Sequence, residues 1–166
     1  MGESLAERIS DGGDEALKRL LQIAESFHRV ALNLRARRTN RTALLIADEY
    51  DVQHVLGALL ASLFQEVRPE EWAPSYAGSA SRVDFLLRNK SIAVETKMTR
   101  DGLSDRKLGD ELIIDIAHYK QIPGCKHLLC FVYDPDHRLR NPSVIEKDLS
   151  KPTDELDVLV LIRPKY

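Results

Sequence analysis

The sequence predicts an α/β fold in which a mixed β-sheet is flanked by helices, with a helical extension at the N-terminus. Apolar residues recur three and four positions apart over 14–38 and again over 49–64, which is typical of two amphipathic helices. The runs 127–133 and 157–162 are apolar at almost every position, as in strands covered by helices on both faces. Two further apolar runs, separated by the polar segment 88–91, predict a β-hairpin.

The length and the charge of the chain restrict its function before any motif is considered. Its 166 residues are 43% apolar and 30% charged, which fits a folded chain with a real hydrophobic core. There are 24 Lys and Arg against 26 Asp and Glu, a net charge of −2 that argues against general polybasic binding of nucleic acid. Because no apolar run approaches the roughly 20 residues of a membrane span, we expect a cytoplasmic protein without membrane contact.

We divide the chain into an N-terminal helical extension, residues 1–47, and a mixed α/β domain, residues 48–166. The apolar stripe on the helix of the extension is typical of a docking surface, so we expect a homodimer or a protein partner there. The segment 29–41 holds five arginines and no acid. Two interpretations stay open: these arginines follow a phosphate backbone, or they form a solvated helix end that complements the helix dipole.

Local signals predict the elements of the α/β domain. Asp48 with Asp51 three positions later indicates a helix N-cap, so the second helix begins at Glu49. The connection 65–81 is rich in proline and small residues and has room for a short strand at its start. The further expected elements, in order, are strands 82–87 and 92–97, a helix over 108–122, and strands 127–133 and 157–162.

The hairpin brings two acids and a lysine together. Its expected register pairs residues whose numbers sum to 179, which places Asp84 opposite Glu95, about 5 Å apart at Cβ. Side chains alternate along a strand, so Lys97 lies on the same face as Glu95. Two facing carboxylates in apolar strands are unfavourable unless a cation compensates them. We expect a divalent cation, Mg²⁺ or Mn²⁺, held by Asp84, Glu95 and the backbone carbonyl of Thr96, to activate water for attack on a phosphate.

A plainer interpretation of the same residues is a solvated sheet face on which Lys97 is an ordinary salt-bridge partner. The apolar Leu86 and Ala93 beside the acids argue against it, because they indicate a partly buried face. Two similar choices stay open elsewhere. Glu49 is either a site residue or a first-turn acid favoured by the helix dipole. The four-residue spacing of Glu111, Asp115 and Tyr119 marks a polar stripe that either supports the site or is a solvated helix face, and we favour the second interpretation.

The residues from Asp84 to Glu95-Thr96-Lys97 resemble the PD-(D/E)xK nuclease signature, although Val83 stands where a proline is frequent. Over about 25–165 the chain more specifically resembles the C-terminal domain of DpnII/MboI-type restriction endonucleases. The resembling blocks are Asp48-Glu49-Tyr50-Asp51-Val52-Gln53, Arg68-Pro69-Glu70-Glu71-Trp72, Pro74-Ser75-Tyr76-Ala77-Gly78, Ser81-Arg82-Val83-Asp84-Phe85-Leu86, Leu112-Ile113-Ile114-Asp115-Ile116 and Cys130-Phe131-Val132-Tyr133-Asp134-Pro135. This resemblance implies a restriction-endonuclease-like fold and Mg²⁺-dependent cleavage of DNA, often within prokaryotic restriction or antiviral systems.

The resemblance assigns Asp84 and Glu95 as metal ligands and Lys97 as the catalytic lysine. Glu49 and Gln53 share a helix face from which they can reach the metal or its waters, and Gln53 is also a candidate contact to nucleic acid. Arg82 and Tyr76 are further candidate contacts to phosphates and bases. The predicted function is therefore a metal-dependent DNA endonuclease. The alternative is a nuclease-fold module that binds nucleic acid or a protein partner without catalysis.

Overall fold

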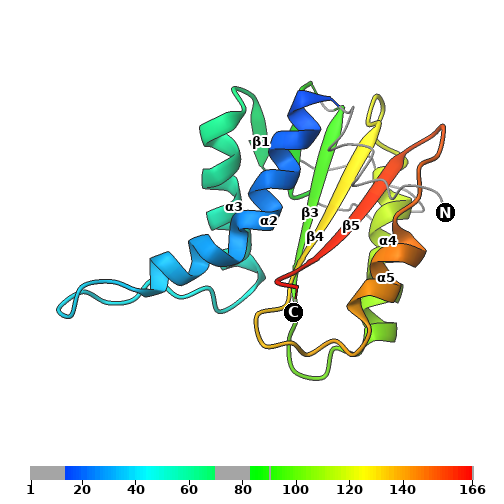
Figure 1. Ribbon diagram of the computed structural model, residues 1–166. Helices are drawn as coiled ribbons and strands as arrows, with labels where there is room; N and C mark the ends of the chain where they lie inside the picture. The colour runs from blue at the N-terminus through cyan, green and yellow to red at the C-terminus, as the bar shows by residue number, and fades with distance from the viewer. Residues whose placement is uncertain (1–13, 70–82, 90, 166) are drawn as a thin grey trace.

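The structure is a computed structural model that describes residues 14–69, 83–89 and 91–165 (Figure 1). The mixed α/β architecture predicted from the sequence is confirmed, with one sheet between two layers of helices. The helices are α2 (Glu15–Arg35), α3 (Glu49–Leu63), α4 (Asp105–Tyr119) and α5 (Pro142–Leu149). The strands are β1 (Val67–Pro69), β2 (Phe85–Leu87), β3 (Ile92–Met98), β4 (His127–Tyr133) and β5 (Asp157–Arg163).

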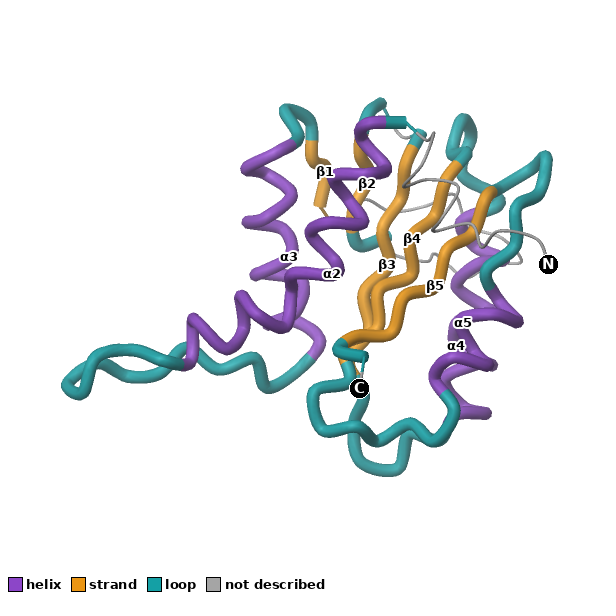
Figure 2. The backbone as a smooth tube through the Cα atoms, viewed as in Figure 1, coloured by secondary structure: helices purple, strands orange, loops and turns teal. Residues whose placement is uncertain are grey.

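The strands described form one sheet in the order β1-β2-β3-β4-β5. The pairs β1/β2 and β2/β3 are antiparallel, whereas β3/β4 and β4/β5 are parallel. Each parallel pair requires a crossover, and α4 and α5 supply these two connections. As a result, the carboxyl ends of β3, β4 and β5 lie at the same end of the sheet (Figure 2).

The predicted register of the hairpin is confirmed, since Phe85 pairs with Val94 and Leu87 with Ile92. Arg88 and Asn89 take positive φ values of 48° and 53° in the connecting turn. The β2/β3 ladder ends at Phe85 and Val94, one pair short of the predicted pairing of Asp84 with Glu95. That pairing was wrong in this detail: Asp84 leaves the ladder, and its carboxylate turns to the backbone and hydroxyl of Thr96 instead.

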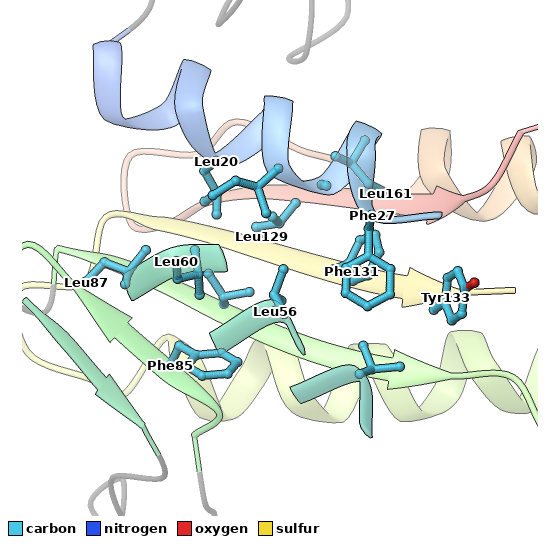
Figure 3. Close-up of a cluster of buried hydrophobic side chains, with 14 of the residues drawn as sticks. Leu20, Phe27, Leu56, Leu60, Phe85, Leu87, Leu129, Phe131, Tyr133 and Leu161 are labelled. Carbon is cyan, nitrogen blue, oxygen red and sulfur yellow. The ribbon is translucent and has the colours of Figure 1, made fainter. Parts of the chain in front are cut away.

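Two hydrophobic cores lie on opposite faces of the sheet, because β4 and β5 carry apolar side chains at alternating positions on both faces. One core joins α2 and α3 to the face that carries Leu129, Phe131 and Leu161 (Figure 3). The other joins α4 and α5 to the opposite face, which carries Leu128 and Val160. The prediction that helices cover both faces is therefore confirmed.

The apolar stripe of α2 belongs to the first of these cores. Phe27 is fully buried, and its ring centroid lies 5.0 Å from those of both Phe131 and Tyr133. Leu20 and Ala24 on the same face are also buried. The interpretation of this stripe as a docking or dimer surface was wrong, because the chain's own sheet covers it. A homodimer or protein partner stays a prediction and requires another surface.

Three of the helices differ from the sequence prediction. Helix α2 ends at Arg35, three residues before the predicted end at residue 38. Helix α4 begins three residues earlier than expected, because the Ser104 hydroxyl caps it by accepting from the backbone N–H of Lys107, and it ends three residues earlier, at Tyr119. Helix α5 was not predicted at all. It has eight residues, only Ile145 is buried, and its N-cap residue Asn141 makes no side-chain capping bond. Among the described residues, no helix is both long and apolar enough to cross a membrane.

Candidate active site

The candidate site lies on β3 and is completed by residues from three neighbouring segments. Strand β3 contributes Glu95 and Lys97, two residues apart on the face that α4 covers. Asp84 approaches from the chain just before β2. The N-terminal turns of α3 bring Glu49 and Gln53, as predicted, and α4 brings Asp115 and Tyr119, which the prediction had left on a solvated face.

The first turn of α3 is fixed by the predicted N-cap. The Asp48 carboxylate accepts from the N–H of Asp51 at 3.0 Å, and the Asp51 carboxylate accepts from the N–H of Ala47 at 2.8 Å. These reciprocal bonds satisfy donors that a helix start would otherwise leave unpaired. They set where α3 begins, and hence where the side chains of Glu49 and Gln53 stand.

Asp84 is held by three hydrogen bonds. Its Oδ2 accepts from the backbone N–H of Thr96 at 2.7 Å and from the Thr96 hydroxyl at 2.6 Å. Its Oδ1 accepts from Nε2 of Gln53 at 2.9 Å. Burial raises the pKa of the Asp84 carboxyl, while the bonds from Thr96 oppose that rise. Gln53 therefore orients a candidate metal ligand in this structure.

Glu95 is the most buried acid of the site, with 7% of its surface exposed. Its Oε2 accepts from the Tyr119 hydroxyl at 2.6 Å, and its Oε1 lies 3.3 Å from Nζ of Lys97. Burial, followed by the charges of Asp84 and Asp115, raises the pKa of Glu95 to about 8. The same tyrosine hydroxyl accepts from the backbone N–H of Asp84 at 3.3 Å, so Tyr119 connects both acids.

Lys97 stands between two carboxylates. Its Nζ lies 2.9 Å from Oδ2 of Asp115 and 3.3 Å from Oε1 of Glu95. Burial disfavours the charged amine, but the acidic neighbours outweigh it and hold the pKa of Lys97 above its ordinary value. Glu49 also interacts with Lys97 and accepts a backbone hydrogen bond from Met98, while burial raises the pKa of its carboxyl. Lys97 is therefore a fixed positive charge at neutral pH.

Four acids and one lysine share this partly buried space, and with every group ionised the cluster of Glu49, Asp84, Glu95, Lys97 and Asp115 carries a charge of −3. Burial is the main reason why the carboxyl pKa values of Glu49, Asp84 and Glu95 are raised, and the charges of neighbouring acids add to the rise. Mg²⁺ is typically bound by one or two carboxylates and keeps several waters, so Asp84 and Glu95 fit it chemically. Within the described ranges, however, no three acid, histidine or cysteine side chains already converge on one ion position.

The structure brings some of the predicted site residues together, and others lie outside the residues that it describes. The structure brings Asp84, Glu95, Lys97, Glu49 and Gln53 together. Arg82 and Tyr76 lie outside the described residues. Thr96 contacts Asp84 through its N–H and hydroxyl, and the proposed role of its carbonyl toward a metal stays a prediction.

The polar stripe on α4 was only partly understood from the sequence. Glu111 is the member that faces outward, pairing with Arg100 at 2.6 Å. Asp115 and Tyr119, one and two helical turns further on, instead point into the site. The four-residue spacing was the available signal, because it puts all three on one helix face.

A mixed sheet between helices, with acids at the β2/β3 junction and a lysine two residues after the second acid, defines a restriction-endonuclease-like domain. The sequence matches the restriction-endonuclease family described as REase DpnII-MboI over residues 18–165. The chain belongs to this DpnII/MboI family, and membership supports its classification as a DNA endonuclease. Neither the curated proteins nor the solved structures include a match to the chain.

Proposed function

We propose that this protein is a Mg²⁺-dependent endodeoxyribonuclease, in which Mn²⁺ can replace Mg²⁺. The observation that carries the proposal is the partly buried cluster of Asp84, Glu95 and Lys97. Its excess of negative charge is unfavourable for a structural core but suits a divalent cation. Asp84 and Glu95 would hold the ion. When bound, it would lower the pKa of water and offset negative charge on the phosphate.

Each of the other side chains of the cluster has a separate role in the proposed reaction. Lys97 is held protonated by Glu95 and Asp115, so it acts as a positive charge toward the phosphate or the attacking water and not as a proton acceptor. Glu49, with its raised carboxyl pKa, would accept a hydrogen bond from that water. Gln53 and Tyr119 keep the two metal-binding acids in place. Water would attack phosphorus as its proton passes to the Glu49 carboxylate, and the P–O bond to the oxygen of the leaving nucleotide would break.

Cleavage of supercoiled plasmid tests this proposal. We expect nicked or linear product with Mg²⁺ or Mn²⁺, none with EDTA, and a loss of about 10²–10³-fold in Lys97→Ala, the range seen when one transition-state charge contact is removed. Lys147→Ala is the matched control, because Lys147 is an exposed lysine on α5. Equal cleavage by Lys97→Ala and the wild-type protein would contradict the proposal. Plasmid binding without cleavage in any metal would favour the non-catalytic binding module.

The biological setting is a second part of the proposal. We propose that the protein acts in the cytoplasm of a prokaryote, in restriction or anti-phage defence, because the family is one of restriction endonucleases. Expression in a bacterial host should reduce plaque formation by infecting phage, and Lys97→Ala should not. If both proteins protect the host equally, the defence role does not depend on DNA cleavage, and this part of the proposal would be contradicted.

A further inference from the structure

A basic arm extends from the body of the protein between α2 and α3. We define it as residues 32–47, from the last turn of α2 to the residue before the α3 cap. The chain runs away from the sheet and then turns back toward α3 (Figures 1 and 2). From Leu32 to Asp51 no residue is buried, whereas Ala31 and Val52 on either side belong to the core. Ile46, near the returning end of the arm, is partly buried and packs against this core. The core therefore anchors that end of the arm, but it does not explain the exposed segment that carries the arginines.

The arm is nevertheless ordered by contacts within itself. The backbone N–H of Leu44 donates to the carbonyl of Leu34 at 3.2 Å, which ties the returning chain to the last turn of α2. Near the tip, the Arg37 guanidinium donates to the carbonyl of Thr42 at 3.0 Å. The N–H of Arg41 donates to the carbonyl of Arg38 at 2.9 Å. These bonds close the loop and leave the arginines of the arm exposed.

The arm is rich in arginine and contains no acidic residue. Arg35, Arg37, Arg38 and Arg41 are all exposed, and Arg29 lies one to two helical turns before them. No acid occurs between Glu25 and Asp48, so the segment 26–47 has a charge of +5, which leaves −7 for the rest of the chain. Among the residues described, no carboxylate lies within ion-pair distance of these four arginines.

The helix dipole does not account for this charge. Arg35 is in the last turn of α2 and is favoured there by the partial negative charge of the helix end. The other three arginines of the arm lie beyond the helix, where the effect of the dipole has decayed. Four like charges within seven residues repel one another, and a polyanion removes that repulsion.

The arm is also within reach of a duplex held at the candidate site. Arg41 precedes Glu49 by eight residues, so their Cα atoms are at most about 29 Å apart even for an extended chain. One turn of B-DNA spans about 34–36 Å. An arginine of the arm can therefore contact phosphates within about one turn of a phosphodiester bond placed beside Glu49.

We propose that the basic arm binds the phosphate backbone of the duplex DNA that this protein cleaves, through Arg35, Arg37, Arg38 and Arg41. This inference rests on the proposed function for the identity of the polyanion. Backbone contacts of this kind position a duplex and raise affinity without reading sequence. The rest of the chain is acidic and repels DNA, so the electrostatic attraction of the protein to DNA would come from the arm.

Salt-dependent binding tests the arm separately from catalysis. Fluorescence anisotropy with a labelled 30-base-pair duplex in EDTA measures the affinity at several salt concentrations, without cleavage. The quadruple variant R35Q/R37Q/R38Q/R41Q should bind DNA more weakly. The plot of log K against log[salt] should also become shallower, with the magnitude of its slope smaller by about 2–4, since each lost phosphate contact contributes about 0.9. The matched control is K120Q/K126Q/K147Q/K151Q, which removes the same charge from exposed lysines elsewhere and should keep the wild-type slope.

Each result has a definite meaning. An unchanged slope in the arginine variant would overturn the arm proposal, while plasmid cleavage by the wild-type protein but not Lys97→Ala would leave the proposed function standing. An equal loss of slope in the lysine control would also overturn it, because net charge and not the arm would then govern binding. If the arginine variant changes the oligomeric state in light scattering but keeps its slope, the arm is a protein contact and the proposal fails. Circular dichroism melting confirms that both variants remain folded.

Discussion

Replacing Glu95 by glutamine should stabilise the metal-free protein at alkaline pH while abolishing DNA cleavage. The Glu95 carboxyl is buried beside Asp84 and Asp115, and its pKa is raised from 4.5 to about 8. The folded state therefore binds this proton more tightly than the unfolded state does. The free energy of unfolding then falls as the pH rises from about 4.5 to about 8. Glutamine has no charge to bury, so Glu95→Gln should lose that dependence.

The size of the effect follows from the shift. Each pKa unit corresponds to about 1.4 kcal/mol, so a rise from 4.5 to about 8 gives an upper bound of about 5 kcal/mol. Lys97, 3.3 Å from the carboxylate, loses one of its two partners in the variant, which offsets part of the gain. We expect Glu95→Gln to be about 2–3 kcal/mol more stable than the wild-type protein at pH 8.5 and no more stable near pH 5.

Urea unfolding in EDTA, followed by circular dichroism at pH 5, 6.5 and 8.5, measures this difference. The control is Glu155→Gln, because that side chain is 79% exposed. A glutamine variant whose advantage is the same at every pH, or one that is less stable than wild type at pH 8.5, would refute the assignment of Glu95 as a strained buried acid. Adding Mg²⁺ at pH 8.5 should then stabilise the wild-type protein and not Glu95→Gln, since binding to the folded state raises stability by mass action.

Two further changes test the surroundings of the site and the role of α2. Tyr119→Phe removes the hydroxyl that bridges Glu95 and Asp84, so we expect about 1–3 kcal/mol of destabilisation and reduced plasmid cleavage, while the exposed Tyr50→Phe should behave as wild type. If Tyr119→Phe cleaves and unfolds like wild type, the bridge has no importance. Phe27→Ala should lower the free energy of unfolding by about 3–5 kcal/mol, because the ring is fully buried, whereas Ile114→Ala on the exposed face of α4 should change it little. The opposite outcome would be a truncated chain, beginning at residue 48 and so lacking α2, that folds as stably as the full chain. That result would mean that residues 1–47 are a separable extension, as the sequence predicted.

The strands and the hairpin register were predictable because local patterns determine them. Alternation along β3 places Glu95 and Lys97 on one face, and the four-residue turn 88–91 leaves the pairing of Phe85 with Val94 unchanged. Helix α5 carried a start signal, Pro142 in its first turn, but it has only eight residues, and one buried side chain and no side-chain capping bond support it. The end of the ladder before Asp84 was not predictable either, because it depends on the bonds that Thr96 offers.

The participation of α4 in the site depends on tertiary packing, which the sequence pattern does not contain. Spacing places Asp115 and Tyr119 on one helix face, but which way that face turns depends on how Leu108 and Leu112 pack against the sheet. The sequence of α2 is limited in the same way. Its apolar stripe predicts that this helix face is buried, but it does not identify the surface that covers it. In the structure the covering surface is the chain's own sheet, through Phe131 and Tyr133.

The uneven distribution of charge explains why a net charge of −2 is compatible with a DNA endonuclease. A site that binds a divalent cation requires an excess of carboxylates, and that excess repels the DNA phosphates until the cation is bound. With −7 outside residues 26–47, the body of this chain has that disadvantage. In the proposed arrangement, the basic arm would attract the duplex at a distance from the acids, so that its arginines would not pair with the carboxylates that would hold the metal. Under these proposals, the basic arm and the acidic site would serve successive steps, binding of the duplex and cleavage of its backbone.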